Sequence, residues 1–314
     1  MRALLTGATG FVGGHVLAEL LRRGHSVRCL IRPRSRPALE DMVRAEDRER
    51  LEVVPGDVAA DNGVGEDAAA GCDAIVHLVG IIRAFPRRGV TFRGVHVGGT
   101  EAMIGAAQRA GISRFLLMSA QGTRPDAATE YHRTKWEAEQ SLRASEMRWT
   151  IFRPSVILGA GGEFLEKILV QLVRPRIAPA LAWGRPRFQP IGAPDLARGI
   201  VNALERPQTE GRVYEVGGRQ ILTLAEMLRT AARARGHGVL LIPTPVALIW
   251  PLAWLLDRFA FFPVTRDQLT MMREESLCED PEPFWRECGV DPAPIADVIR
   301  EAVSASRPTR RGAA

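Results

Sequence analysis

The chain has 314 residues, 46% of them hydrophobic and 25% charged, which is the composition of a soluble globular protein with ample length for a buried core. Its formal charge is +6, and nearly all of the positive charge is arginine, with 40 Arg against 2 Lys. No nucleic-acid motif and only two tyrosines accompany this charge, so we expect no nucleic-acid partner and consider an anionic cofactor or an anionic membrane instead.

The four cysteines, Cys29, Cys72, Cys278 and Cys288, form no CxxC motif and no spacing typical of a metal site. We therefore expect reduced thiols, no metal and a cytoplasmic protein. The apolar run at the N-terminus is too short for a signal peptide and leads into a glycine-rich turn, which favours a strand.

The first half of the chain alternates predicted strands with predicted helices. In chain order these are a strand at 3–6, a helix at 12–23, strands at 26–31, 51–54 and 74–79, a helix at 98–109, a strand at 114–119, a helix at 131–145 and a strand at 149–153. This alternation predicts an α/β fold, a Rossmann-type doubly wound parallel sheet with helices on both faces.

After about residue 155 the alternation loosens and prolines cluster. We expect a dinucleotide-binding domain at 1–155 and a smaller C-terminal substrate lobe at 156–303, partly interleaved with it. The lobe would cover the carboxyl ends of the strands, where ligands of such sheets bind. The tail at 304–314 is expected to be disordered.

Residues 6–13 read TGATGFVG and place Gly7, Gly10 and Gly13 between a predicted strand and a predicted helix. A dinucleotide-binding turn requires this context. Gly7 would permit the tight turn, Gly10 would let the backbone approach a pyrophosphate, and Gly13 would allow close packing of helix on sheet. The amides of the helix N-terminus would bind the phosphates, although the same glycines also suit a plain turn.

Arginines follow the second predicted strand, at Arg32, Arg34 and Arg36, where an NAD-selective domain has an acidic residue for the ribose hydroxyls. Arg32 is placed to bind a 2′-phosphate, so we predict NADP(H) as the preferred cofactor and NAD(H) as the alternative. In so arginine-rich a chain, Arg32 also fits an ordinary surface position. Asp57, after the third strand, is placed either to meet the adenine or to cap a helix.

Tyr131 and Lys135 stand in YHRTK, four residues apart on a predicted helix, so they share a helix face. A nearby ammonium group favours phenolate and would lower the pKa of the tyrosine. The tyrosine would then move a proton between a carbonyl and an alcohol, and the lysine would also bind the nicotinamide ribose. The alternative is an ordinary solvated helix face.

The stretch Gly238–Leu256 has no charged residue and contains Trp250 and Trp254. Its prolines argue against one membrane-spanning helix. The stretch would either close an apolar substrate pocket, lie in the interface of an anionic membrane, or form ordinary core of the second lobe.

Taken together, the motifs resemble the short-chain dehydrogenase/reductase superfamily in its extended and atypical, epimerase/dehydratase-like branches. The matching pieces are TGATGFVG, GDV at 56–58, HLVG at 77–80, MSAQG at 118–122, YHRTK, RPSVILG at 153–159, FQPIGAPDLARGIVNAL at 188–204 and YEVGG at 214–218. Their order and spacing are similar to those of bacterial relatives of the nucleotide-binding accessory subunit of mitochondrial complex I.

The resemblance implies a full set of site residues. Those implied to bind the cofactor are Gly7, Thr9, Gly10, Phe11, Val12, Gly13, Arg32, Asp57, Val58, Leu78, Val79, Gly80, Ser119, Tyr131, Lys135, Pro154 and Ile157. Tyr131 and Lys135 are the implied catalytic pair, with Ser119 or Thr123 polarising the substrate oxygen. Two departures are visible: the family's hydroxyl lies a little before Thr123, and His96 in VHVGGT stands where the family often has Asn.

Three functions follow as hypotheses. The first is an NAD(P)-dependent oxidoreductase acting on a carbonyl or hydroxyl of a small apolar substrate, such as a quinone-like or lipid-like one. The second is a non-catalytic, NADP(H)-bound structural or assembly protein of a membrane respiratory complex, peripheral on the inner membrane. The third is an NAD-dependent epimerase or dehydratase. Because members of one fold serve different roles, the fold alone does not choose among them.

Overall fold

The computed structural model describes residues 1–60, 64–65, 67–162, 169–247, 250 and 266–305. The chain forms two compact units and passes between them several times. Unit 1 contains Met1–Pro154, Pro194–Val216 and Glu279–Asp291, and unit 2 contains Ser155–Ala193, Gly217–Cys278 and Pro292–Ala314.

Unit 1 is built on a seven-stranded sheet with the order β11-β6-β5-β4-β1-β2-β3. The strands are β1 (Arg2–Thr6), β2 (Ser26–Ile31), β3 (Leu51–Pro55), β4 (Ala74–His77), β5 (Arg114–Met118), β6 (Arg148–Pro154) and β11 (Arg212–Val216). Every neighbouring pair is parallel. The order reverses between β1 and β4, and such a switch point is where open parallel sheets bind ligands.

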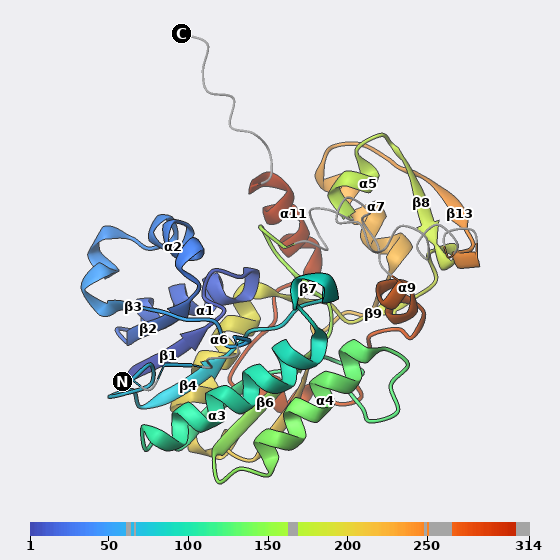
Figure 1. Ribbon diagram of the computed structural model, residues 1–314. Helices are drawn as coiled ribbons and strands as arrows, with labels where there is room; N and C mark the ends of the chain where they lie inside the picture. Colours follow the sequence, from blue (N-terminus) through green and yellow to red (C-terminus); the bar gives the residue numbers. More distant parts are fainter. Residues whose placement is uncertain (61–63, 66, 163–168, 248–249, 251–265, 306–314) are drawn as a thin grey trace. The chain divides into compact units, whose positions relative to one another are not determined.

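Helices cover both faces of this sheet (Figure 1). The helices of unit 1 are α1 (Phe11–Arg22), α2 (Arg36–Met42), α3 (Gly99–Arg109), α4 (Glu130–Arg143), α6 (Ala193–Glu205) and α10 (Glu282–Glu287). α3 and α4 pack together on one face, whereas α6 lies beside α1, because Glu205 binds Arg23 at 2.9 Å and His25 at 2.8 Å. The predicted doubly wound Rossmann-type sheet is confirmed.

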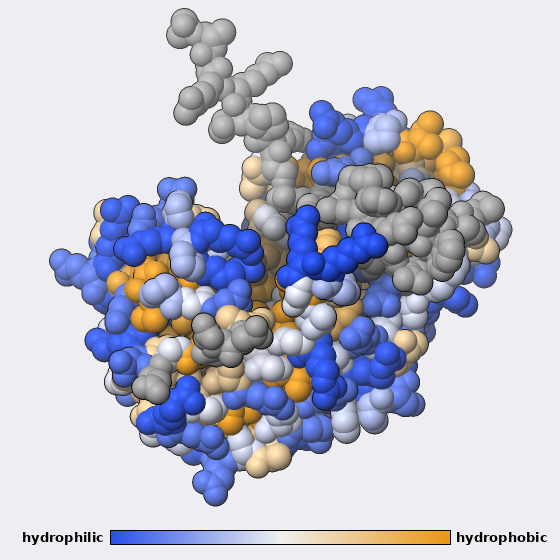
Figure 2. Space-filling model, in the orientation of Figure 1, coloured by the Kyte–Doolittle hydropathy of each residue, from blue (hydrophilic) through white to orange (hydrophobic). Residues whose placement is uncertain are grey.

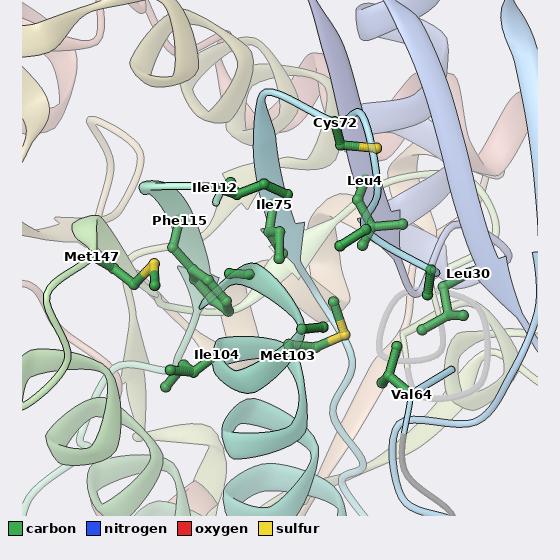
Figure 3. Packing of buried hydrophobic residues seen from close by; sticks show 14 of the residues in the cluster. Leu4, Leu30, Val64, Cys72, Ile75, Met103, Ile104, Ile112, Phe115 and Met147 are labelled. Atoms are coloured by element: carbon green, nitrogen blue, oxygen red, sulfur yellow. The ribbon is translucent and has the colours of Figure 1, made fainter. Parts of the chain in front are cut away.

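The apolar runs form strands because they are buried on both sides. All five residues of β5 are buried, as expected for a central strand of a parallel sheet. Figure 3 shows Met103 and Ile104 of α3 packed near Ile75 of β4 and Phe115 of β5. Burying side chains of this size contributes about 1.5–3 kcal/mol each.

A buried ion pair ties α4 to β6. Glu139 of α4 is fully buried, and Arg153 of β6 donates to its two carboxylate oxygens from Nε at 2.8 Å and Nη2 at 2.6 Å. Arg143 adds a longer contact at 3.4 Å. A two-pronged pair of this kind fixes geometry as well as charge. It therefore holds the helix that carries Tyr131 and Lys135 against the sheet.

Part of the second half of the chain returns to unit 1. β11 pairs with β6 from Arg212↔Thr150 to Val216↔Pro154 and so adds the seventh strand. Tyr214 stacks on Phe152, with the ring centroids 5.9 Å apart, and its hydroxyl donates to Glu287 at 2.7 Å. The segment Glu279–Asp291 is therefore anchored on this edge strand and belongs to unit 1.

Unit 2 consists of short strand pairs and helices. The strands are β7 (Ile157–Leu158) with β10 (Ile191–Gly192), β8 (Ile177–Leu181) with β13 (Leu240–Thr244), and β9 (Arg187–Phe188) with β12 (Leu222–Thr223). The helices are α5 (Gln171–Val173), α7 (Leu224–Ala234), α9 (Arg266–Arg273) and α11 (Ile295–Ala305). α7 begins with a capping box between Thr223 and Glu226 and packs on α11.

The helix α11 includes Ser304 and Ala305, so these two residues are not part of a disordered tail as expected, and the rest of the expected tail, 306–314, lies outside the described residues. No helix within the described ranges is long and apolar enough to cross a membrane.

Candidate functional site

The glycine turn joins β1 to α1 at the switch point of the sheet. Gly7 has a φ of +77°, which favours glycine, and its carbonyl accepts from the Gly10 amide at 2.9 Å. A Cβ on Gly13 would lie 1.9 Å from the Gly7 carbonyl oxygen, so the first turn of α1 packs directly on the turn and excludes any side chain there. This is the close helix–sheet contact that the sequence predicted.

The N-terminus of α1 is open to a ligand. Its first turn holds no acidic residue, Gly10 at the N-cap is exposed, and Thr9, Phe11 and Val12 are partly exposed around it. The amides of a helix N-terminus carry a partial positive charge and bind phosphate groups. The residues present therefore fit a pyrophosphate.

At the switch point, the end of β4 is held against the end of β1. Thr6 Oγ1 and His77 Nδ1 are 2.7 Å apart, and a Cβ on Gly7 would lie 3.3 Å from the Leu78 carbonyl carbon and the Val79 amide nitrogen. Leu78 and Val79 are half-buried and Gly80 is exposed. The segment implied to line the middle of the cofactor thus lies directly beside the glycine turn.

The residues expected at the adenosine end follow β2 and β3. Arg32 is exposed and comes directly after β2, at the N-cap of the short 3-10 helix Pro33–Ser35. Arg36 is bound to Glu40 at 2.9 Å, whereas no carboxylate among the described residues pairs with Arg32 or Arg34. Those two guanidinium groups remain available to an anion.

Asp57 and Val58 form the turn after β3. Asp57 Oδ1 accepts from the Ala59 amide at 3.1 Å and so closes a local turn rather than capping a helix. Val58 is buried, and a Cβ on Gly99 would lie 3.1 Å from its side chain, so it packs on the start of α3. The half-buried carboxylate keeps its other oxygen for further contacts.

Tyr131 and Lys135 occupy the first two turns of α4, which begins after the N-cap Thr129. Lys135 is buried, and its Nζ donates to the Met118 carbonyl at 2.9 Å at the end of β5. Burial lowers the pKa of Lys135 to about 8, although the nearby Glu139 carboxylate opposes this shift. The lysine is therefore fixed at the carboxyl edge of the sheet with its charge only weakly favoured.

Tyr131 behaves differently from the expectation that its lysine neighbour lowers its pKa. Its ring packs against His96 and Phe92 at centroid distances of 5.4 and 6.0 Å, and burial raises the pKa of the phenol to about 12. Loss of hydration raises this pKa because phenolate is the charged form. At neutral pH Tyr131 is a protonated phenol, which suits a proton donor.

Ser119 and Thr123 are brought together by a turn. Gly122 has a φ of +83°, which reverses the chain, and the Ser119 hydroxyl donates to Thr123 Oγ1 at 3.4 Å. Both side chains are buried. Although Thr123 comes late in the sequence, its hydroxyl therefore lies beside that of Ser119. Ser119 directly follows Met118, whose carbonyl accepts the hydrogen bond from Lys135.

His96 lies in the π-helical segment Gly94–Gly98. The family motifs gave this residue no role, yet both of its ring nitrogens form hydrogen bonds. Thr134 Oγ1 donates to the Glu130 carbonyl at 2.8 Å, so His96 Nδ1, 2.9 Å away, donates to Thr134, and its Nε2 accepts from the Ile81 amide at 3.1 Å. Burial lowers the pKa of His96 to about 2, so the ring stays neutral.

His96 thereby fixes the backbone that follows β4. A Cβ on Gly80 would lie 2.8 Å from Lys135 Nζ and 3.6 Å from His96 Nε2, so both nitrogens lie close to the Gly80 backbone. π-Helical turns occur often at functional sites. The departure from Asn in VHVGGT was the available signal for this residue.

Pro154 and Ile157 fall in different units. Pro154 ends β6 in unit 1, and its carbonyl accepts from the Gln121 amide at 2.9 Å. Ile157 begins β7 in unit 2, where it pairs with Ile191.

Comparison with known proteins agrees with this geometry. Residues 7–164 match the NAD(P)H-binding family. The chain is 22% identical over 300 residues to the mitochondrial NADH-ubiquinone oxidoreductase 40 kDa subunit of Neurospora crassa, covering 94% of this chain and 76% of that protein. It is 29% identical over 257 residues to ceramide reductase of Caulobacter vibrioides, covering 82% and 77%.

Among solved structures, a double mutant of a dTDP-glucose 4,6-dehydratase from Streptomyces venezuelae with NAD and DAU bound superposes with a TM-score of 0.76. The two are 21% identical, and the match covers 99% of this chain and 98% of that one, so the likeness extends over the fold of both units. The glycine turn at the switch point and the NAD(P)H-binding family match over half of the chain agree on a nicotinamide cofactor. The chain belongs to the NAD(P)H-binding family, among the extended short-chain dehydrogenases/reductases related to the 40 kDa subunit of complex I.

Proposed function

We propose that the protein is an NAD(P)-dependent oxidoreductase that reduces a carbonyl group of an apolar substrate, or oxidises the corresponding alcohol. One observation carries the proposal: Tyr131, a half-buried phenol, lies one helical turn before Lys135, whose ammonium is fixed at the carboxyl edge of the sheet. The likeness to a relative named ceramide reductase supports a lipid-like substrate.

The residues divide the work as follows. When bound, the nicotinamide supplies the hydride in the reducing direction and accepts it in the other. Tyr131 Oη gives its proton to the substrate oxygen as the carbonyl becomes a hydroxyl, and the raised pKa of the phenol keeps that proton in place at neutral pH. Lys135 stabilises the phenolate that remains, and the Ser119–Thr123 hydroxyl pair polarises the oxygen.

A second function has support of its own. The likeness to a respiratory-complex subunit extends over 94% of this chain, which favours a cofactor-bound structural or assembly role at a membrane respiratory complex. In that case the nucleotide stabilises the fold by mass action and is not turned over. For either role, we propose a location on the cytoplasmic face of the inner membrane, which the charge-free stretch Gly238–Leu256 and its exposed Trp250 support. Its residues 248–249 and 251–256, with Trp254, lie outside the described part of the chain.

Native mass spectrometry of the purified protein separates the two roles. We expect a retained nicotinamide nucleotide whose oxidation state changes when an apolar ketone is added. A retained nucleotide that keeps its oxidation state with every ketone and alcohol tried would contradict the enzymatic role and favour the structural one.

We also propose that NADPH binds more tightly than NADH, because Arg32 is exposed and unpaired within the described residues. A charge-assisted contact to the 2′-phosphate contributes about 1.5–3 kcal/mol, or roughly 10- to 100-fold in affinity. Calorimetry should show this preference fall or invert in Arg32→Glu. Arg36→Gln is the matched control, since Arg36 already binds Glu40. Equal affinities for both nucleotides in the wild type would refute the preference.

A further inference from the structure

The parallel pair β8–β13 of unit 2 exposes an apolar outer face. Leu240 pairs with Ile177 and Ile242 with Pro179, and the exposed fractions are 61% for Leu240, 54% for Ile177 and 46% for Ile242. The alternate residues Ala178 and Ala180 are buried. Side chains alternate between the two faces of a strand, and a solvated face is normally polar. Here the face turned to solvent is apolar as well.

Two exposed tryptophans follow the ends of these strands, and the turn that carries the first contacts both β8 and β13. Trp183, in the 3-10 turn Ala182–Gly184 after β8, is 57% exposed, and Trp250 is 37% exposed. Together with Pro245, Val246 and Ala247 they line a cavity of about 520 Å³. The surface defined by Ile177, Leu240, Ile242, Trp183 and Trp250 is hereafter the β8–β13 surface; Figure 2 shows hydrophobic side chains exposed where Figure 1 places these strands.

The backbone that presents Trp183 is strained. Ala182 and Trp183 have φ values of +49° and +63°, a region that a bulky residue enters at a cost of about 1–3 kcal/mol. The next residue, Gly184, leaves no room for a side chain, since a Cβ there would lie 2.8 Å from the Ala225 methyl group. The fold therefore holds an aromatic ring in solvent at an energetic cost, which selection for stability alone does not explain.

The positive charge of the protein resides on the same unit. Unit 2 contains 16 basic and 9 acidic residues, whereas unit 1 contains 26 basic and 27 acidic ones. Arg176 directly precedes Ile177, Arg185 follows Trp183 by two residues, and Arg273 lines the cavity; all three are exposed. Within the described ranges no carboxylate pairs with them, although the nearby Arg187 does bind Glu275, at 2.9 Å.

We propose that the β8–β13 surface docks on an anionic phospholipid bilayer. The tryptophan rings lie at headgroup level, Ile177, Leu240 and Ile242 enter the acyl boundary, and the unpaired arginines contact lipid phosphates. A second copy of the chain fits this surface poorly, because the contact would bring two units of net charge +7 together. The inference deepens the proposed function, since an apolar substrate would then be taken from the bilayer.

Flotation of the full-length protein with vesicles tests the docking. We expect binding to vesicles of equal parts phosphatidylglycerol and phosphatidylcholine, weak binding to phosphatidylcholine alone, and release by high salt. The variant Leu240→Ser/Trp183→Ser should bind at least about tenfold more weakly, because apolar area leaves the contact. Met42→Ser, which changes a side chain 47% exposed on unit 1, is the matched control and should bind like the wild type.

Trp183 offers an independent readout. Bromine-labelled acyl chains should quench part of the tryptophan fluorescence in the wild type, and Trp183→Phe should still bind while that quenching falls. Three results would overturn the proposal: a wild type that stays in the soluble fraction, a double variant that binds normally, or a lipid-free dimer that Leu240→Ser dissociates. Nucleotide retention by native mass spectrometry in the same variants keeps this outcome separate from the proposed oxidoreductase activity.

Discussion

Tyr131→Phe should lower turnover about 10²- to 10⁴-fold while leaving cofactor affinity almost unchanged, which is the usual contribution of a positioned acid/base group. The substitution removes only the hydroxyl and keeps the ring packed against His96 and Phe92. Steady-state kinetics with an apolar ketone, together with calorimetry for the nucleotide, measure the two effects separately. The loss should therefore fall on kcat.

Lys135→Met provides the contrast. The lysine serves both the tyrosine and the nicotinamide ribose, so this variant should lose turnover and cofactor affinity together. A structural protein would give a different pattern, with Tyr131→Phe silent in every assay and Lys135→Met still weakening the nucleotide. An active wild type with a fully active Tyr131→Phe variant would mean that another residue moves the proton.

Gly10→Val should abolish nucleotide binding while the fold survives. A Cβ at Gly10 meets only the Gly7 carbonyl oxygen, at 3.1 Å, which requires a small shift of that oxygen, and the extended backbone of Gly10, with φ −81° and ψ 169°, accepts a β-branched residue. The added side chain instead fills the space over the helix N-terminus where the pyrophosphate would lie. Calorimetry with NADPH and NADH checks binding, and circular dichroism checks the fold.

Gly238→Val is the matched control for this substitution, since an added Cβ at Gly238 meets no atom within 4 Å. Nucleotide affinity should be unchanged there. If Gly10→Val bound the nucleotide as tightly as the wild type, the turn would serve only to connect β1 with α1.

The central strands of the sheet were predictable because each combines burial with a local signal. β1, β2 and β5 are short apolar runs bounded by turns, and burial in a parallel sheet demands that pattern. The glycine turn was predictable for a related reason, since the contact between Gly13 and the Gly7 carbonyl excludes every other residue.

What escaped prediction depends on contacts between distant segments. The seventh strand, β11, is defined by its pairing with β6 and by the Tyr214–Glu287 hydrogen bond, which joins residues 73 positions apart. The contact between Ser119 and Thr123 requires the left-handed conformation of Gly122. The outer face of β8–β13 depends on the pairing register, which cannot be predicted from the sequences of two short strands. The pKa of Tyr131 follows from burial, which a spacing of four residues does not reveal.

The position of β11 late in the chain affects folding during synthesis. During synthesis β6 is complete at Pro154, but its outer neighbour lies at Arg212–Val216, so the chain must grow by nearly 60 residues before that edge is covered. An uncovered edge strand readily pairs with another chain. The nascent protein therefore passes through a stage in which a nearly complete Rossmann sheet is prone to aggregation. Fragments ending near residue 155 would stay at that stage, because they lack β11.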